Sequence, residues 1–295
     1  MVRPAPARPA GPEVPIGALP GPPAAPARRY GRPMDPRGKV VVVTGAAGGI
    51  GSALVRAVAA AGAAHVVAAD LRADGVPTGE RVEARTLDVS DAAATAGLVE
   101  DVTAAHGPID LWFANAGIAG GGGYDAPADV WQRQWDVNVM SHVHAAQALF
   151  PGWIARGEGH LVTTASMAGI LTSLGDGVYA AAKHAAVGLA EWLAITHAEH
   201  GITVSCVCPG AVDTPMLRGG AGGDAAKATA AIGGGQVLSA DDAAARVIEG
   251  VREGRFLIYT HPEMRDFVIG KAEDPERWIR GMTRLWGRAQ ELLSD

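Results

Sequence analysis

The chain has 295 residues, a formal net charge of −6 and 48% hydrophobic residues. This hydrophobic content is ample for a buried core, and the negative charge argues against nucleic acid or an anionic membrane as the main partner. No apolar run is long enough to span a bilayer. The two cysteines, Cys206 and Cys208, lack metal-type spacing and fit a reduced, cytoplasmic chain better than a disulfide framework.

Residues 1–34 differ in composition from the rest of the chain. Ten of the nineteen prolines lie there, mixed with Ala, Gly and Arg. Proline at this density blocks both helix and sheet, so we expect a disordered tail. The tail lacks the apolar core of a signal peptide, and its prolines oppose the amphipathic helix of a transit peptide, although the arginines leave that alternative open.

A regular alternation of strand-like and helix-like segments begins at Lys39. Val40 to Val43 form a β-branched run that is typical of a strand buried on both faces. Alternation of this kind predicts an α/β fold with one doubly wound parallel sheet and helices on both faces, in a single domain. We expect strands at 40–43, 65–69, 82–87, 109–114, 161–164, 203–208 and 256–259. We expect helices at 52–61 and 130–150, a helix that Ser90 or Asp91 caps and that runs to residue 106, and a helix that contains Tyr179 and runs to about residue 200.

A glycine-rich loop joins the first strand to the first helix. Gly45, Gly49 and Gly51 allow the backbone to approach a pyrophosphate, which would sit at the helix N-terminus. Asp70 closes the next strand, where a carboxylate can accept hydrogen bonds from an adenosine ribose and repel a 2′-phosphate. This acid favours NAD over NADP, although Arg72 is near enough to accommodate that phosphate.

Polar residues follow the ends of several predicted strands. In open α/β sheets, ligands bind outside the carboxyl ends of the strands, so these residues should rim one crevice. They are Gly45, Asp70, Asp88, Asn115, Ser166 and Pro209. Asp88 has an alternative role as a helix cap.

Tyr179 and Lys183 lie four residues apart in an Ala-rich segment and share one face of a helix. An ammonium group beside a phenol favours the phenolate, so we expect Lys183 to lower the pKa of Tyr179 toward neutrality. Such a tyrosine exchanges a proton with an alcohol or carbonyl, and the Ser166 hydroxyl would hold the substrate oxygen. The alternative is that Tyr179 only packs and Lys183 is solvated.

Together these motifs resemble the short-chain dehydrogenases/reductases, in their main single-domain NAD(P)-dependent branch, over about residues 38–260. The family implies a seven-stranded Rossmann-type sheet and hydride exchange between a nicotinamide and a secondary alcohol or ketone. The matching motifs are Thr44-Gly45-x-x-x-Gly49-Ile50-Gly51, Asp88-Val89, Asn115-Ala116-Gly117, Asn138, Ser166, Tyr179-x-x-x-Lys183 and Pro209-Gly210-x-Val212-x-Thr214.

The resemblance implies a role for each matching residue. Tyr179 would be the general acid/base, Lys183 would tune it and bind the nicotinamide ribose, and Ser166 would position the substrate. Asn138 would hold a water that connects Lys183 to solvent. The expected cofactor contacts are Gly45, Gly49, Ile50, Gly51 and Asp70, then Asp88 and Val89 at the adenine, Asn115 and Gly117 on the adenosine side, and Val212 and Thr214 at the carboxamide; no metal is expected.

The sequence departs from the family in two places. Ala114 stands where the family usually has a first Asn, which removes a structural hydrogen bond. After the last strand, an apolar stripe that includes Trp278, Met282 and Trp286 predicts an amphipathic terminal helix. That helix would pack on the core, cover the pocket or make a subunit contact, so a homodimer is as compatible as the usual homotetramer.

We therefore expect a disordered tail (1–34), a Rossmann-fold domain (35–262) and a helical extension packed on it (263–295). A Gly/Ala-rich segment at 215–237 should be a mobile substrate loop. We expect the substrate to be an apolar alcohol or ketone, because apolar residues should line its pocket. They are Met167, Ile170, Leu171, Val178, Met216 and Leu217. The alternatives are an NADPH-preferring ketone reductase and a non-enzymatic nucleotide sensor.

Overall fold

The computed structural model describes residues 30–219 and 236–294. The predicted parallel sheet is confirmed: its seven strands lie in the order β3-β2-β1-β4-β5-β6-β7, and every neighbouring pair is parallel. The strand bounds lie within two residues of the expected ones. The strands are β1 (Val40–Thr44), β2 (His65–Asp70), β3 (Val82–Thr86), β4 (Leu111–Ala114), β5 (Gly159–Thr164), β6 (Ile202–Cys208) and β7 (Leu257–Tyr259).

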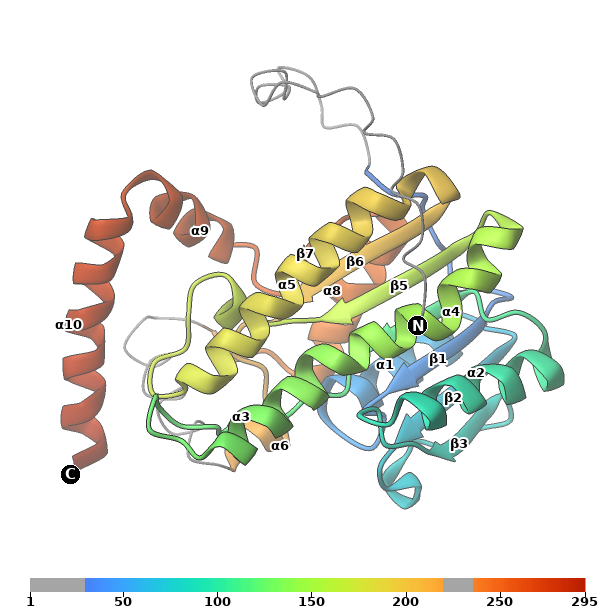
Figure 1. The fold of residues 1–295 in the computed structure, drawn as a ribbon, viewed down its shortest axis with the longest axis horizontal. Coiled ribbons are helices and arrows are strands. Elements are labelled where there is room, and N and C mark those ends of the chain that lie inside the picture. Colours follow the sequence, from blue (N-terminus) through green and yellow to red (C-terminus); the bar gives the residue numbers. More distant parts are fainter. Residues whose placement is uncertain (1–29, 220–235, 295) are drawn as a thin grey trace, which may run out of the picture.

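Helices connect the strands and cover both faces of the sheet (Figure 1). The helices of eight or more residues are α1 (Gly49–Ala60), α2 (Ala92–His106), α3 (Ala128–Trp135), α4 (Ser141–Arg156), α5 (Gly177–His197), α8 (Ala240–Glu253), α9 (Met264–Glu273) and α10 (Pro275–Ser294). Short helical turns are η2 (Ala73–Gly75), η3 (Asp136–Met140), η4 (Met167–Gly169), η5 (Ala198–His200) and α6 (Pro215–Arg218).

Two apolar cores lie on opposite faces of the sheet. The first, called the α4–α5 core below, contains side chains of α2, α4 and α5 such as Leu98, Phe150 and Leu193. The second, called the α1–α8 core below, contains side chains of α1 and α8 such as Leu54 and Val247. Because the four valines of β1 alternate between the two cores and are almost fully buried, this strand lies at the centre of the molecule.

The strand order reverses direction between β1 and β4, which are neighbours in the sheet although two strands separate them in the chain. At such a switch point the loops after the two strands turn to opposite faces and leave a crevice between them. The Gly45 loop follows β1, and Asn115 follows β4. The topology therefore brings two of the predicted cofactor segments together.

The expected single helix at 130–150 is not a regular helix. It consists of α3, one π-helical turn (η3) and α4, and the chain stays helical to Arg156 despite Pro151. The π turn contains Asn138, whose side chain bonds both backbone groups of Ile118 outside the helix. Such turns widen the helix by one residue, here at the position where the side chain must reach the β4 loop.

The last residues of the segment that the sequence assigns to the tail pack on the domain. Residues 1–29 lie outside the described part, but Tyr30 to Met34 pack on the domain instead of belonging to a free tail. Backbone hydrogen bonds join Gly31 to Gly254 and Met34 to Val251, and the Tyr30 hydroxyl donates to the Ala194 carbonyl oxygen. Only 7% of Met34 is exposed, because its thioether fills the α1–α8 core.

The C-terminal extension contains two helices, α9 and α10, where one was expected. α10 packs against α9 and stands away from the sheet (Figure 1). Met264, Val268 and Trp278 contact the α4–α5 core, whereas 62% of Ile279 is exposed. No helix in residues 30–219 or 236–294 is long and apolar enough to cross a membrane.

Candidate active site

The glycine loop after β1 has the tight geometry that the sequence predicts. Gly45 and Gly49 have φ values of 68° and 54°, which favour glycine. A Cβ on Gly51 would lie 2.0 Å from the Gly45 carbonyl oxygen, so part of the glycine requirement comes from packing within the loop. The N-cap of α1 is Gly48, so this helix end has no side-chain cap, and its first turn contains no acid. Its amide groups are therefore suited to an anion.

Asp70 lies at the carboxyl end of β2, directly beside this loop. Its carboxylate accepts hydrogen bonds from the amides of Ala47 at 3.0 Å and Arg72 at 3.1 Å. These bonds fix the negative charge at the rim of the crevice and leave further oxygen lone pairs for a ligand.

Asp88 is exposed and accepts two hydrogen bonds from Ser90, one from its amide at 2.9 Å and one from its hydroxyl at 2.6 Å. These bonds hold the pKa of Asp88 below its ordinary value. The cap of α2 is Asp91, which accepts from Ala93 and Ala94, so the proposed helix-cap role belongs to that residue. The side chain of Val89 packs against the α4–α5 core.

Thr44 and Asn115 join the ends of β1, β4 and β5. The Thr44 hydroxyl accepts hydrogen bonds from the amides of Asn115 and Ala116. The Asn115 amide group donates to the Thr44 carbonyl oxygen at 3.0 Å, and its oxygen accepts from Thr164 at 3.4 Å. The side chain of Asn115 is thus used for structure, and its backbone lines the loop.

Ser166, Tyr179 and Lys183 converge at the end of β5. Ser166 follows that strand, and its hydroxyl accepts from the Ala168 amide at 3.0 Å and is near enough to the Tyr179 hydroxyl to lower its pKa. The Lys183 ammonium donates to the Thr164 carbonyl oxygen at 2.9 Å and lies 5.6 Å from the centre of the Tyr179 ring. Only 3% of Lys183 is exposed, so the alternative of a solvated lysine is excluded.

The expectation that Lys183 lowers the pKa of Tyr179 is wrong for the protein without cofactor. Burial raises the pKa of Tyr179, and the hydrogen bond from Ser166 opposes this rise only in part. Burial also lowers the pKa of Lys183 to about 8. Desolvation disfavours the charged form of both groups.

Asn138 is fully buried one helix away from Lys183, and its carboxamide is fully engaged. Its oxygen accepts from the Ile118 amide at 3.1 Å, and its nitrogen donates to the Ile118 carbonyl oxygen at 2.9 Å and to the Gln134 side chain. A Cβ on Gly117 would lie 2.9 Å from Asn138 Oδ1 and 3.4 Å from Lys183 Nζ. Gly117 therefore permits the close approach of the β4 loop to both residues.

Val212 and Thr214 follow β6, and Thr214 reaches the glycine loop. Val212 is buried, and Thr214 caps the short helix α6 by accepting from the Leu217 amide. A Cβ on Gly49 would lie 3.0 Å from the Thr214 methyl group. Most of the expected substrate loop, residues 220–235, lies outside the described part of the chain.

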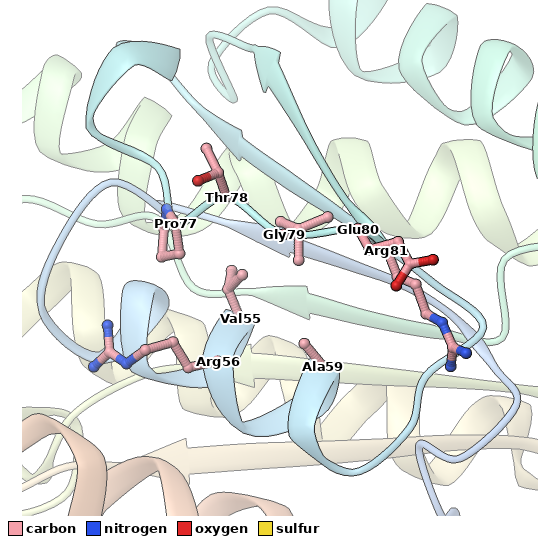
Figure 2. A pocket seen from close by; sticks show the side chains of 9 residues that line it. Val55, Arg56, Ala59, Pro77, Thr78, Gly79, Glu80 and Arg81 are labelled. Atoms are coloured by element: carbon pink, nitrogen blue, oxygen red, sulfur yellow. The ribbon is translucent and has the colours of Figure 1, made fainter.

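The apolar lining differs from the prediction. Met167, Leu171 and Val178 are at least 93% buried, because Met167 and Leu171 belong to the α4–α5 core and Val178 packs against Gly121. Ile170, Met216 and Leu217 keep exposed surface. A hollow of about 390 Å³ lies elsewhere, where Val55 and Ala59 of α1 face residues 77–82 (Figure 2), and no predicted site residue lines it.

The sequence reasoning missed two buried polar residues at this site. Asp176 caps α5 by accepting from the Tyr179 amide, and its carboxylate also accepts from the amides of Gly120 and Gly121 at 2.8 and 3.1 Å. An acid directly before the predicted helix, at the N-cap position, was the available signal. His142 is fully buried, and burial together with the charge of Lys183 lowers its pKa to about 3; no sequence signal distinguishes it.

Comparisons with known proteins agree with this geometry. The family model described as short chain dehydrogenase matches residues 39–221. A 1-deoxy-11-beta-hydroxypentalenate dehydrogenase from Streptomyces exfoliatus is 35% identical over 258 residues, covering 82% of this chain and 90% of the relative.

Solved structures show the same fold. A short-chain dehydrogenase/reductase from Burkholderia phymatum in complex with NAD is 30% identical with a TM-score of 0.74, covering 82% of this chain and 96% of that one. A Burkholderia cenocepacia short chain dehydrogenase in complex with NADP is 22% identical with a TM-score of 0.71, covering 83% and 97% of the two chains. At this identity, the second comparison concerns the fold alone.

Proposed function

The chain belongs to the short-chain dehydrogenase family, and from that premise we propose that it transfers a hydride between NAD(H) and a secondary alcohol or ketone, with Tyr179 as general acid/base. Membership makes it an NAD(P)-dependent oxidoreductase that acts on CH–OH groups. The observation that carries the finer proposal is the convergence of Ser166, Tyr179 and Lys183 beside Gly117.

The residues at the switch point fit a dinucleotide. The uncapped N-terminus of α1 would hold the pyrophosphate, and nothing but Pro215 at 4.0 Å would meet a Cβ on Gly48, which leaves space above the loop. Asp70 would accept hydrogen bonds from the adenosine ribose. Its carboxylate is held against the loop by Ala47 and would repel a 2′-phosphate, which supports NAD over NADP.

A bound oxidised nicotinamide supplies the acceptor for the hydride that leaves the carbinol carbon. In this direction the Ser166 hydroxyl would donate a hydrogen bond to the substrate oxygen, and the Tyr179 phenolate would take the hydroxyl proton. The substrate C–O bond becomes C=O as the hydride departs. In the reduction direction Tyr179 would return its proton to the carbonyl oxygen.

Burial raises the pKa of Tyr179, so the phenolate form needs positive charge nearby. An oxidised nicotinamide would supply such a charge when bound. Lys183 contributes its charge and a fixed position, which the Thr164 carbonyl oxygen maintains.

The substrate class follows from the surfaces that stay open. Ile170, Met216 and Leu217 are apolar and lie on segments that follow β5 and β6, next to Ser166 and Thr214. We propose an apolar secondary alcohol or ketone. The relative from Streptomyces exfoliatus is named for a hydroxy compound, which agrees with oxidation of a CH–OH group.

The test is cofactor-linked turnover of the full-length protein across a panel of secondary alcohols and ketones, followed by absorbance of the reduced cofactor. The proposal predicts activity with NAD that exceeds activity with NADP. Tight NAD binding without turnover of any panel member would instead favour a nucleotide sensor, and a strong NADP preference would refute the role of Asp70.

A further inference from the structure

A cluster of two histidines and one glutamate lies far from the predicted active site. His65 is the first residue of β2, Glu83 lies in β3, and His106 is the last residue of α2. Both imidazole Nε2 atoms lie 3.1 Å from the same carboxylate oxygen, Glu83 Oε2. Within residues 30–219 and 236–294, this is the sole group of at least three His, Cys, Asp or Glu whose ligand atoms lie within 4.8 Å of one another.

We propose that His65, Glu83 and His106 form a binding site for a divalent transition-metal ion of the Zn²⁺ type. Two imidazoles and a carboxylate are a donor set that Zn²⁺ uses in proteins, with a fourth position open to water. All three side chains are partly exposed, so an ion can enter and keep a water ligand. Mg²⁺ and Ca²⁺ prefer oxygen ligands and do not suit this set.

The spacing of the ligand atoms agrees with a tetrahedral ion. Metal–ligand bonds of about 2.0–2.1 Å place neighbouring ligands of a tetrahedron roughly 3.3 Å apart. The two carboxylate–imidazole distances of 3.1 Å are close to this value. The rings are stacked, with centroids 3.5 Å apart and planes 17° from parallel. The imidazoles must therefore fan apart to direct both lone pairs at one ion, and their partly exposed positions leave room for this rotation.

The surroundings of Glu83 prepare it as a ligand. Arg85 Nε lies 2.7 Å from the other carboxylate oxygen, Oε1, and Asp101 pairs with the same arginine. This contact orients the carboxylate and leaves Oε2 facing the imidazoles, as the outer partners of metal ligands do.

The position of the cluster assigns the ion a structural role. His65 begins β2, whereas Asp70 ends it, so about 16 Å of strand separates the cluster from the predicted cofactor crevice. An ion there would join β2, β3 and the end of α2, three elements at the edge of the sheet. On binding the ion, the two imidazole hydrogen bonds to Glu83 Oε2 would give way to three bonds from these side chains to the metal.

The experiment uses full-length, untagged protein stripped with a chelator and titrated with ZnCl₂ by calorimetry, with MgCl₂ as the control ion. The proposal predicts saturable binding of one Zn²⁺. The melting temperature should rise by roughly 5 °C or more at a hundredfold excess over Kd, and MgCl₂ should have no such effect. Absence of saturable Zn²⁺ binding to the wild-type protein would overturn the proposal.

Three variants locate the site. His65→Gln, His106→Gln and Glu83→Gln should each weaken Zn²⁺ binding at least tenfold. The matched control, His200→Gln, changes a partly buried histidine in η5 and should bind as the wild type does. His106 ends its helix, so its replacement leaves the fold intact, which far-ultraviolet circular dichroism verifies. Equal binding by His106→Gln and the wild type would refute the assignment.

Discussion

The buried His142 makes a quantitative prediction about stability and pH. Its ring lies fully buried beside Lys183, and burial lowers its pKa from 6.5 to about 3. Protonation is thus disfavoured in the folded protein and free to occur in the unfolded chain. The stability that depends on neutral His142 is fully present above pH 6.5 and is lost as the pH falls toward 3.

The magnitude follows from the two pKa values. Between pH 7 and pH 5 the unfolded chain gains most of a proton at this site and the folded protein gains almost none, which costs about 2 kcal/mol of unfolding free energy. His142→Leu removes the titrating group. Leucine is apolar and of similar volume, so it fills the same buried position.

Urea unfolding of both proteins at pH 7 and pH 5 measures the difference. The wild type should lose about 2 kcal/mol more than His142→Leu over this range. His160, another buried histidine with a pKa of about 3, is present in both proteins and cancels in the comparison. Equal losses would show that His142 is not held neutral by burial and would refute the reasoning.

Three further substitutions test other parts of the site. Gly51→Ala places a Cβ 2.0 Å from the Gly45 carbonyl oxygen, so it should lower the unfolding free energy by about 1–3 kcal/mol. It should also abolish NAD binding in calorimetry. The control Gly152→Ala, which has open space around it, should do neither. Asp70→Ser should raise the NADP/NAD ratio of kcat/KM at least tenfold; an unchanged ratio would contradict the repulsion argument. Asp176→Ala removes the acceptor of the Gly120 and Gly121 amides, of which the Gly121 amide is buried, and should cost about 1–3 kcal/mol in urea unfolding.

The fold was predictable because its signals are local and repeated. The four valines of β1 and the alternation of strand and helix patterns specify a parallel sheet, and polar residues after each strand must then meet at one edge. Asp70 ends β2 and Ser166 follows β5, so both lie at the edge of the sheet that this rule indicates.

What the sequence did not reveal depends on contacts between distant segments. The π turn at Asn138 exists because its side chain reaches Ile118, twenty residues earlier. Met34 is ordered because it fills a gap between α1 and α8. Sequence periodicity reveals neither contact, because each depends on the tertiary packing of segments that are distant in the chain.

The same limit applies to electrostatics. A Tyr-x-x-x-Lys spacing predicts attraction between the two groups, but the balance with desolvation depends on how completely the neighbours exclude water. In the folded protein burial raises the pKa of Tyr179 and lowers that of Lys183. Likewise, His65, Glu83 and His106 come from three separate elements, so no sequence spacing predicts that they lie together.

The most direct test of the proposed chemistry is the Tyr179→Phe variant, which removes one oxygen from the site. The account predicts that its Kd for NAD in calorimetry stays within about twofold of the wild type and that kcat falls at least about a hundredfold. Tyr30→Phe, which changes a tyrosine bonded to Ala194 at the far end of α5, should keep its turnover. Undiminished kcat in Tyr179→Phe would contradict the assignment of Tyr179 as the general acid/base.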